Sequence, residues 1–239
     1  MDISTKANKA RAYMEKSLEK RLEINGKLLE NGVSFLDIES AFIDENVKIG
    51  AGTKIYPNVV IEGDTVIGEG CVIGMGSKIS NSTIGDKVNI ETSYIIDSKV
   101  GNETNIGPFA YLRPNSVIGN NCKVGDFVEV KNSSLGDGTK SAHLTYIGDS
   151  DLGKGINLGC GVVFVNYDGT NKFRSEIGDN AFIGCNTNIV SPVKVGEGAY
   201  IAAGSTVTKD VPEDALCIAR SKETIKENWA KEKGLYKKK

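Results

Sequence analysis

The sequence predicts an all-β fold, a parallel β-helix built from six-residue units, with an N-terminal helix and a short C-terminal helix. Three observations predict it: branched apolar residues recur every six positions, glycine follows many of them directly, and a small or β-branched residue often stands four positions further on. We call the recurring apolar residues anchors. They form three runs: Ile43, Ile49, Ile55, Ile61, Ile67, Ile73, Ile79; Val100, Ile106, Leu112, Ile118, Val124, Val130; and Ile177, Ile183, Ile189, Val195, Ile201, Val207.

A period of six does not fit one face of an α-helix, because successive anchors would advance by about 600° and drift around its surface. Independent antiparallel strands would need longer alternating stretches and hairpin turns. A short strand that ends in a tight corner does fit, since the anchor points inward and glycine permits the positive φ that the corner requires. Three units make one triangular coil, in which each buried Ile or Val contributes about 1.5–3 kcal/mol.

The repeat is interrupted in two ways. The anchor spacing drops to five at several corners, for example from Ile79 to Ile84, which predicts that these corners are squeezed or reoriented. Residues 165–176 break the repeat altogether; they are polar and contain an Asp168-Gly169 turn. We expect them to form a loop that projects from the β-helix, where binding residues tend to lie.

The two ends differ from the repeat and set the expected domain limits. Residues 1–35 are predicted to form a helix and linker, 36–211 the β-helix, and 212–239 a C-terminal helix with a basic tail. Ile225 and Trp229, four positions apart, indicate the second helix. Covering the open ends of the β-helix is the simplest role for both helices.

Composition limits the partners and the compartment. The chain has 239 residues, 28 glycines and a formal net charge of −2, so no overall field attracts it to nucleic acid or to a membrane. We find no secretory signal and no run of roughly 18 apolar residues. The five cysteines lack a CxxC pair, which favours reduced thiols in a cytoplasmic protein over a disulfide framework or a zinc site.

The one histidine of the chain, His143, is the first candidate for chemistry. It falls between Leu135 and Ile147, where the anchor series lapses, and Tyr146 and Asp149 are close enough in sequence to orient its ring. A neutral imidazole is suited to taking a proton from an amine. The alternative is a structural or merely exposed histidine, which is the more common case for a lone one. A single histidine per chain also supplies too few ligands for a metal site, so none is predicted.

Five stretches of the chain closely resemble a known family: Gly107–Pro114, Val124–Asn132, His143–Asp149, Val165–Gly169 and Ile201–Thr206. They are similar to the acetyltransferase half of the bifunctional glucosamine-1-phosphate N-acetyltransferase and N-acetylglucosamine-1-phosphate uridyltransferase. The resemblance implies a left-handed parallel β-helix of the hexapeptide-repeat type. It also implies acetyl transfer from acetyl-CoA to the amine of glucosamine-1-phosphate, a step toward the cell-envelope precursor UDP-N-acetylglucosamine, by a homotrimer with sites between subunits and no metal.

The resemblance also assigns roles to individual residues. His143 falls at the position of the general base, and Arg113 and Lys131 at the positions of cations that hold the sugar phosphate. Residues matching the sugar site are Tyr146 and Asn157. Residues matching positions around acetyl-CoA are Cys160, Asn166, Tyr167, Lys172, Cys185, Ala203 and Arg220. Each also has a simpler reading, as a solvated corner, a turn residue, a small packing residue or an end cap.

Two departures from the family and two rival functions are part of the prediction. No glycine-rich nucleotide loop precedes Arg11, so uridyl transfer is not expected. Members of the family also tend to have threonines near Val162 and Phe164, where this chain is apolar. If those two side chains face the acetyl pocket, acyl or acceptor preference differs. The rivals are an acyltransferase for another sugar phosphate, nucleotide-sugar or serine hydroxyl, and a non-catalytic β-helix assembly subunit.

Overall fold

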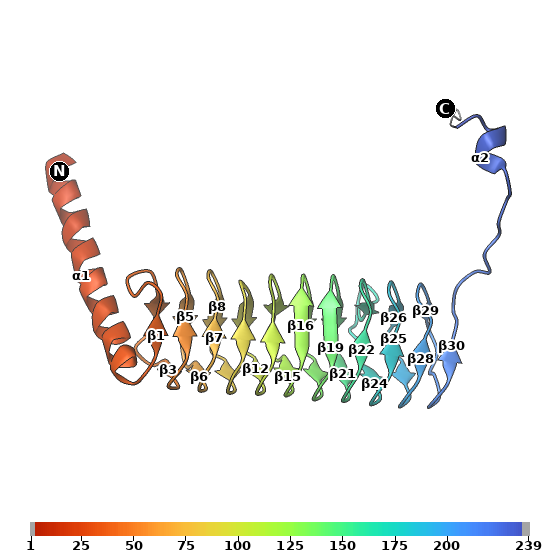
Figure 1. Cartoon of the computed structure of the whole chain (residues 1–239), viewed down its shortest axis with the longest axis horizontal. Coiled ribbons are helices and arrows are strands. Elements are labelled where there is room, and N and C mark those ends of the chain that lie inside the picture. The colour runs from red at the N-terminus through yellow and green to blue at the C-terminus, as the bar shows by residue number, and fades with distance from the viewer. Residues whose placement is uncertain (1–2, 236–239) are drawn as a thin grey trace.

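The computed structural model describes residues 3–235 and confirms a parallel β-helix flanked by two helices (Figure 1). Within this range, three parallel sheets of 11, 10 and 9 strands form the three faces of a long prism, which we call faces A, B and C. The chain visits face A, then B, then C in each coil, so that each strand pairs with the strand one coil away. The predicted fold class is therefore correct.

The strands are two to four residues long. Face A contains β1 (Ser34–Phe35), β4 (Lys54–Ile55), β7 (Val72–Ile73), β10 (Asn89–Ile90), β13 (Asn105–Ile106), β16 (Lys123–Asp126), β19 (Lys140–His143), β22 (Asn157–Leu158), β25 (Phe182–Ile183), β28 (Tyr200–Ile201) and β30 (Leu216–Cys217). Face B contains β2 (Phe42–Ile43), β5 (Val60–Glu62), β8 (Lys78–Ser80), β11 (Tyr94–Ile96), β14 (Tyr111–Leu112), β17 (Glu129–Lys131), β20 (Tyr146–Gly148), β23 (Val163–Val165), β26 (Asn188–Val190) and β29 (Thr206–Val207). Face C contains β3 (Lys48–Ile49), β6 (Val66–Ile67), β9 (Thr83–Ile84), β12 (Lys99–Val100), β15 (Val117–Ile118), β18 (Ser134–Leu135), β21 (Ser150–Leu152), β24 (Ser175–Ile177) and β27 (Lys194–Val195).

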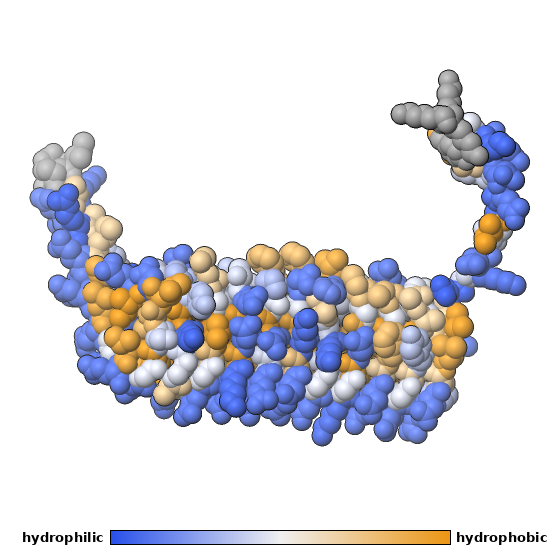
Figure 2. All heavy atoms as spheres, viewed as in Figure 1, coloured by the Kyte–Doolittle hydropathy of each residue, from blue (hydrophilic) through white to orange (hydrophobic). Residues whose placement is uncertain are grey.

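The anchors form three aliphatic columns along the prism axis. On face A, Ile55 pairs with Ile73 and Ile73 with Ile90, and all three side chains are buried. Neighbouring strand residues alternate to the outside, so the interior is apolar while the surface is mixed (Figure 2). The six-residue period thus fixes both the coil and its core.

One residue with positive φ stands at most corners, including the shortened ones. At the four shortened corners between faces B and C the left-handed residue is Asn81 (φ 48°), Asp97 (φ 45°), Asn132 (φ 48°) or Asp149 (φ 47°), and at the shortened corner between faces A and B it is Thr92 (φ 37°). Asn and Asp accept this conformation more readily than other non-glycine residues. A shorter corner therefore keeps its left-handed residue and loses one of the others.

The edge between faces C and A shows why glycine follows so many anchors, and the reason is not the expected one. Gly68 has no positive φ; the left-handed residue of its corner is Gly70 (φ 64°), and Gly68 is required by close stacking. A Cβ at Gly68 would lie 2.2 Å from Asp86 Oδ1 and 2.7 Å from the carbonyl carbon of Gly85. Side chains stabilise the same edge: the Asp86 amide donates to Asn102 Oδ1 at 2.8 Å, and the Asn102 amide to Asn120 Oδ1 at 2.8 Å. The coils stack here too closely for any larger residue.

The lapse in the anchor series near His143 has a clear cause. On β19 the anchor position is Ser141, which is fully buried and whose hydroxyl has no hydrogen-bond partner. One coil further on, Phe164 is the largest fully buried side chain. Val162 is also fully buried, so neither it nor Phe164 lies on the surface where substrates would bind. The sequence-based link between these two residues and acyl preference is therefore not supported.

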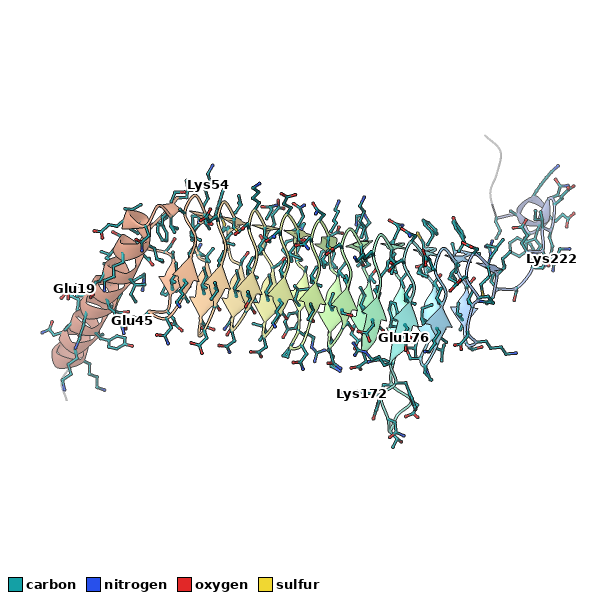
Figure 3. The ribbon with its side chains drawn as sticks, turned by 90° about the horizontal axis from the view of Figure 1, so that it is seen from below. Glu19, Glu45, Lys54, Lys172, Glu176 and Lys222 are labelled. Carbon is teal, nitrogen blue, oxygen red and sulfur yellow. The ribbon has the colours of Figure 1, made fainter. Side chains whose placement is uncertain are left out.

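Two helices and a loop extend from the prism. Helix α1 (Ile3–Glu30) leans away from its first coil, joined there by the Asn25 amide, which donates to the carbonyls of Ile38 (2.8 Å) and Ala41 (2.9 Å). Helix α2 (Trp229–Glu232) lies at the end of an extended arm (Figure 1). Between β23 and β24 a loop projects sideways, with Lys172 on it (Figure 3). The basic tail lies outside the described residues, and neither helix, as far as it is described, is long and apolar enough to cross a membrane.

Candidate active site

His143 lies at the edge between faces A and B, half exposed, with 56% of its side chain accessible. Its Nδ1 is 2.7 Å from Oδ1 of Asp126, the residue that pairs with His143 in the strand of the preceding coil. If Nδ1 carries the proton and donates a hydrogen bond to this carboxylate, the lone pair of Nε2 is free to accept a proton from a substrate. Sequence had suggested that Tyr146 and Asp149 orient the ring. The structure gives this role to Asp126, because the coil register brings together residues 17 positions apart.

Four of the residues predicted near acetyl-CoA follow His143 along the same edge. The amide of Gly161 donates to the His143 carbonyl (3.3 Å), that of Asn186 to Cys160 (2.8 Å), and that of Gly204 to Cys185 (2.8 Å). The next residue in this column is Ala203, and Arg220 Cδ lies 3.9 Å from where a Cβ on Gly204 would be. Thus Cys160, Cys185, Ala203 and Arg220 form one continuous row with the candidate base.

The two predicted phosphate-holding cations lie on face B. Arg113 Nη1 is 2.7 Å from Glu129 Oε1, a hydrogen bond that raises the pKa of the arginine. Lys131 Nζ is 3.6 Å from Asp149 Oδ2. In the backbone ladder, Lys131 pairs with Gly148, whose strand begins at Tyr146, three residues after His143. Face B therefore carries the imidazole at one edge, Tyr146 next to it, and both cations toward the other edge.

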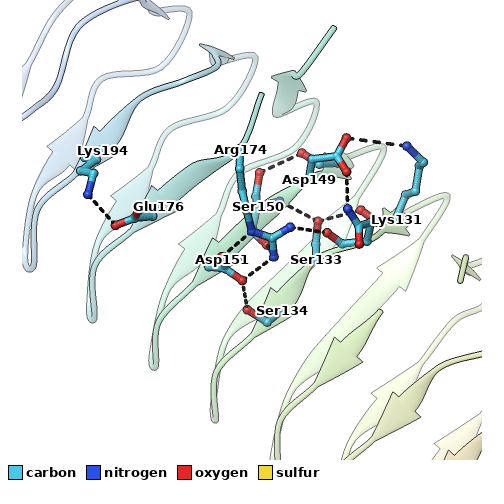
Figure 4. Close-up of polar contacts among 11 residues, drawn as sticks. Lys131, Ser133, Ser134, Asp149, Ser150, Asp151, Arg174, Glu176 and Lys194 are labelled. Atoms are coloured by element: carbon cyan, nitrogen blue, oxygen red, sulfur yellow. Dashed lines mark hydrogen bonds and ion pairs between the residues drawn. The ribbon is translucent and has the colours of Figure 1, made fainter. Parts of the chain in front are cut away.

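Asp149 is the centre of a buried polar network between faces B and C (Figure 4). Burial by itself would raise its pKa, but hydrogen bonds from Asn132 (2.5 Å) and Asn166 and the charge of Lys131 hold the pKa below its usual value. Asn166 is itself buried. In the single chain its amide therefore holds Asp149 rather than facing the row of cofactor positions.

The base of the projecting loop is held by Arg174, which sequence reasoning missed. Its guanidinium forms two hydrogen bonds to the carboxylate of Asp151, both 2.5 Å, and a third to the carbonyl of Asn132 at 2.8 Å (Figure 4). The arginine lowers the pKa of Asp151. An arginine at the end of a polar insertion is a signal that a salt bridge holds the loop. The sequence does not reveal its partner, because Asp151 lies 23 positions earlier.

The outer part of the loop is a small hairpin. Tyr167 and Lys172 form an antiparallel bridge, and Asp168 Oδ1 accepts hydrogen bonds from the amides of Thr170 and Asn171. The Tyr167 ring is exposed and its hydroxyl donates to the carbonyl of Gly169. The loop leaves the prism between faces B and C, so within one chain Tyr167 and Lys172 are separated from the His143 row.

Asn157 is also separated from the other sugar-site candidates. It lies on β22 of face A, exposed, beside Lys140 and Phe182, whereas Tyr146 and Lys131 lie on face B. One chain thus divides the predicted residues among the A–B edge, face B with its loop, and face A. Over the described residues, no three His, Cys, Asp or Glu side chains are grouped as metal ligands.

Comparison with known proteins agrees with the repeat. Residues 38–113 match the family described as GMPPB C-terminal domain, and residues 97–132 and 174–209 match the bacterial transferase hexapeptide (six repeats). Bifunctional protein GlmU of Clostridioides difficile (strain 630) is 57% identical over 213 residues, 89% of this chain and 46% of the relative. Over most of its own length the chain is therefore similar to GlmU, and two of its segments match the hexapeptide-repeat model. The resemblance found in the sequence is confirmed.

Other comparisons define the extent of the likeness. GlmU of Clostridium kluyveri (strain ATCC 8527) is 51% identical over 237 residues, 99% of this chain and 51% of that protein. The chain therefore spans about half the length of the GlmU proteins it matches. Among solved structures, a UDP-N-acetylglucosamine acyltransferase of Francisella novicida has a TM-score of 0.48 and 22% identity, covering 82% of this chain and 72% of that one.

Proposed function

We propose that the chain transfers an acetyl group from acetyl-CoA to the amine of glucosamine-1-phosphate. The observation that carries the proposal is the position of His143. Its Nδ1 contacts Asp126, and it begins the row that contains Cys160 and Cys185. Three residues after it, Tyr146 begins the strand that pairs with the strand of Lys131. In this proposal the imidazole serves as the base between a candidate acetyl-CoA edge and two cations that hold the sugar phosphate. The likeness to GlmU supplies the substrate pair.

The chemistry assigned to His143 is general-base catalysis of a direct transfer. Nε2 takes a proton from the amine as its nitrogen attacks the thioester carbonyl; a C–N bond forms, the C–S bond breaks, and the proton passes on to the departing CoA thiolate. Such assistance contributes about 10²–10⁴-fold to the rate. No covalent acyl-enzyme is needed, so the cysteines of the row have no nucleophilic role, and no step is assigned to a metal ion.

Arg113 and Lys131 are assigned to the sugar phosphate. Arg113 offers a planar fork and Lys131 a point charge, the two geometries with which proteins hold phosphate oxygens. Arg113 is paired with Glu129 and Lys131 with Asp149, and these ion pairs hold the two charged side chains in one orientation. Binding of the phosphate at this end of face B would leave the amine of the sugar toward Tyr146 and His143.

The proposed site is completed by neighbouring copies in a homotrimer. Asn157 on face A and the loop with Tyr167 and Lys172 lie away from the His143 row of their own chain. A flat prism face also makes a shallow site, and a pocket large enough for CoA needs a second wall. A neighbouring subunit would supply both the wall and the missing residues.

The test is an acetyl-CoA consumption assay with glucosamine-1-phosphate, compared with glucosamine and UDP-glucosamine. Of the three acceptors, we expect only glucosamine-1-phosphate to be acetylated. For His143→Ala we expect kcat to fall by roughly 10²–10⁴-fold. Because His143 is half exposed, the variant should keep the unfolding temperature of the parent. Near-parental turnover in this variant would remove His143 from the mechanism, and preference for another acceptor would replace the substrate.

A further inference from the structure

Cys160 and Cys185 lie side by side on successive coils. Their strands pair in register, Asn157 with Phe182 and Leu158 with Ile183, and hydrogen bonds continue around the corner. The Gly159 amide donates to the Ile183 carbonyl (2.8 Å), and the Asn186 amide donates to the Cys160 carbonyl (2.8 Å). Because adjacent strands are about 4.8 Å apart, the two cysteine backbones satisfy the separation of roughly 4.4–6.8 Å between Cα atoms that a disulfide requires.

The Cys185 side chain lies over the preceding coil. Its Sγ is 2.9 Å from where a Cβ on Gly159, the residue before Cys160, would be. Cys185 is exposed and Cys160 half-buried. Both thiols are therefore within reach of a small reagent in solution.

The other cysteines differ. Cys71 and Cys122 are buried, and burial raises the pKa of both thiols. Their sulfurs lie 3.1 Å and 3.2 Å from the carbonyl oxygens of Gly85 and Gly136. Because the thiolate is the reactive form, these two are protected. Cys217, half-buried, is the terminal residue of β30, away from a thiol partner in the ladder.

We propose that Cys160 and Cys185 are a redox-sensitive thiol pair, converted to an intrachain disulfide by a low-molecular-weight disulfide, and that the bridge blocks the acetyl-CoA edge. One thiolate attacks the small disulfide and releases one small thiol. The second cysteine attacks the resulting mixed disulfide and releases another, so two protein thiols lose two electrons and two protons as one small disulfide becomes two thiols. The formation of the bridge stands on geometry; its effect on acetyl-CoA rests on the proposed function.

The position of the pair explains why the bridge would matter. Cys160 follows His143 in the row, and Cys185 follows Cys160, so the sulfur–sulfur bond would lie across the surface assigned to the thioester end of acetyl-CoA. An exposed bridge between directly paired strands is also expected to be reduced readily, because exposed or strained disulfides have higher reduction potentials. The modification is therefore reversible.

The experiment equilibrates the full chain in buffers of oxidised and reduced glutathione, traps free thiols by alkylation, and maps the peptides by mass spectrometry. We expect a Cys160–Cys185 intrachain disulfide, reversed by dithiothreitol, with Cys71 and Cys122 alkylated only after unfolding. Calorimetry on the same samples should show acetyl-CoA binding at least about tenfold weaker in the oxidised form.

Cys185→Ser and Cys217→Ser provide the comparison. Cys185→Ser should form no intrachain disulfide at Cys160 in either buffer, and any loss of acetyl-CoA affinity that remains on oxidation should match the amount of Cys160 mixed disulfide found by mass spectrometry. Cys217→Ser should form the Cys160–Cys185 bridge and respond to oxidation as the parent does. Mixed disulfides alone, or crosslinks between chains alone, would overturn the pair. A bridge that forms without weakening acetyl-CoA binding would overturn its effect. Failure of the reduced chain to bind acetyl-CoA would instead overturn the proposed function and leave the bridge standing.

Discussion

The orientation of one imidazole depends on a single carboxylate. The His143 ring makes a polar contact between its Nδ1 and Asp126 Oδ1, at 2.7 Å. A neutral imidazole has two tautomers, and a hydrogen bond at one nitrogen decides which nitrogen keeps the lone pair. In the proposed mechanism Asp126 is a positioning residue, because its carboxylate would accept a hydrogen bond from Nδ1–H and leave the Nε2 lone pair to act as the base.

This residue gives a prediction that does not depend on turnover. Since the chain has one histidine, its two ring ¹⁵N resonances can be assigned without ambiguity. We expect the parent to show the Nδ1–H tautomer, and Asp126→Ala to shift toward Nε2–H with a fall in kcat of about 10- to 100-fold, less than for loss of the imidazole. Asp126→Asn, which keeps an acceptor oxygen, should recover part of both.

The control for Asp126→Ala is Asp64→Ala, which removes the same charge from an exposed corner of a distant coil. It should leave the ¹⁵N spectrum and kcat at parental values. An unchanged tautomer in Asp126→Ala would show that the carboxylate does not orient the ring. A changed tautomer with full activity would show that orientation of the ring does not limit the rate.

At the scale of the elements, the period of the anchors made the fold predictable. Each coil repeats the same pattern of apolar, small and corner residues, so the strands, corners and core can be located by counting residues. The polar break at 165–176 marks the loop. The contact between Asp126 and His143 was missed because it depends on coil length: it spans 17 residues rather than 18, since the corner between Val130 and Leu135 is one residue shorter. Counting anchors around the shortened corner would have found it.

Other parts of the site were beyond sequence reasoning for a different reason. Arg174 reaches Asp151 and Asn132 across an insertion whose path no repeat specifies. The burial of Asn166 likewise follows from its contact with Asp149 at the base of that loop. Where the period is lost, residue spacing no longer predicts neighbours, and only the three-dimensional packing shows which side chains meet.

The close stacking of β16 and β19 gives a prediction at this scale. A Cβ at Gly125 would lie 2.2 Å from the carbonyl oxygen of Ala142 and 2.8 Å from its Cα. Gly125→Ala should push the two strands apart beside Asp126 and His143, and overpacking of this kind costs about 1–3 kcal/mol. We expect a lower midpoint of chemical denaturation and a ¹⁵N spectrum shifted toward that of Asp126→Ala.

Gly26→Ala is the matched substitution, because nothing lies within 4 Å of a Cβ at this position of α1. It should leave the denaturation midpoint unchanged or raise it slightly, since alanine favours a helix over glycine by roughly 0.8–1.0 kcal/mol. If both substitutions had the same effect, the contact between β16 and β19 would not be the cause of the loss in Gly125→Ala.

At the scale of the whole molecule, the prism carries the proposed site in separate pieces. A rigid stack cannot bend face A toward face B, because the packed core and the ladders hold each coil at a fixed angle. The arm that ends in α2 and the loop with Lys172 both extend away from the prism (Figures 1 and 3). The architecture therefore favours a site made by several copies, each contributing a different surface.

Subunit complementation tests this arrangement directly. His143→Ala and Asn157→Ala should each be nearly inactive as pure proteins, but when denatured, mixed in equal amounts and refolded together, they should recover activity. If the site takes His143 from one chain and Asn157 from its neighbour, about one quarter of the sites in random trimers have both residues intact.

The matched control mixes His143→Ala with Asp126→Ala. These residues touch within one chain, at 2.7 Å, so mixing creates no site in which both are intact and activity should not exceed the average of the two pure variants. No gain in the first mixture would mean that His143 and Asn157 do not act across an interface between chains.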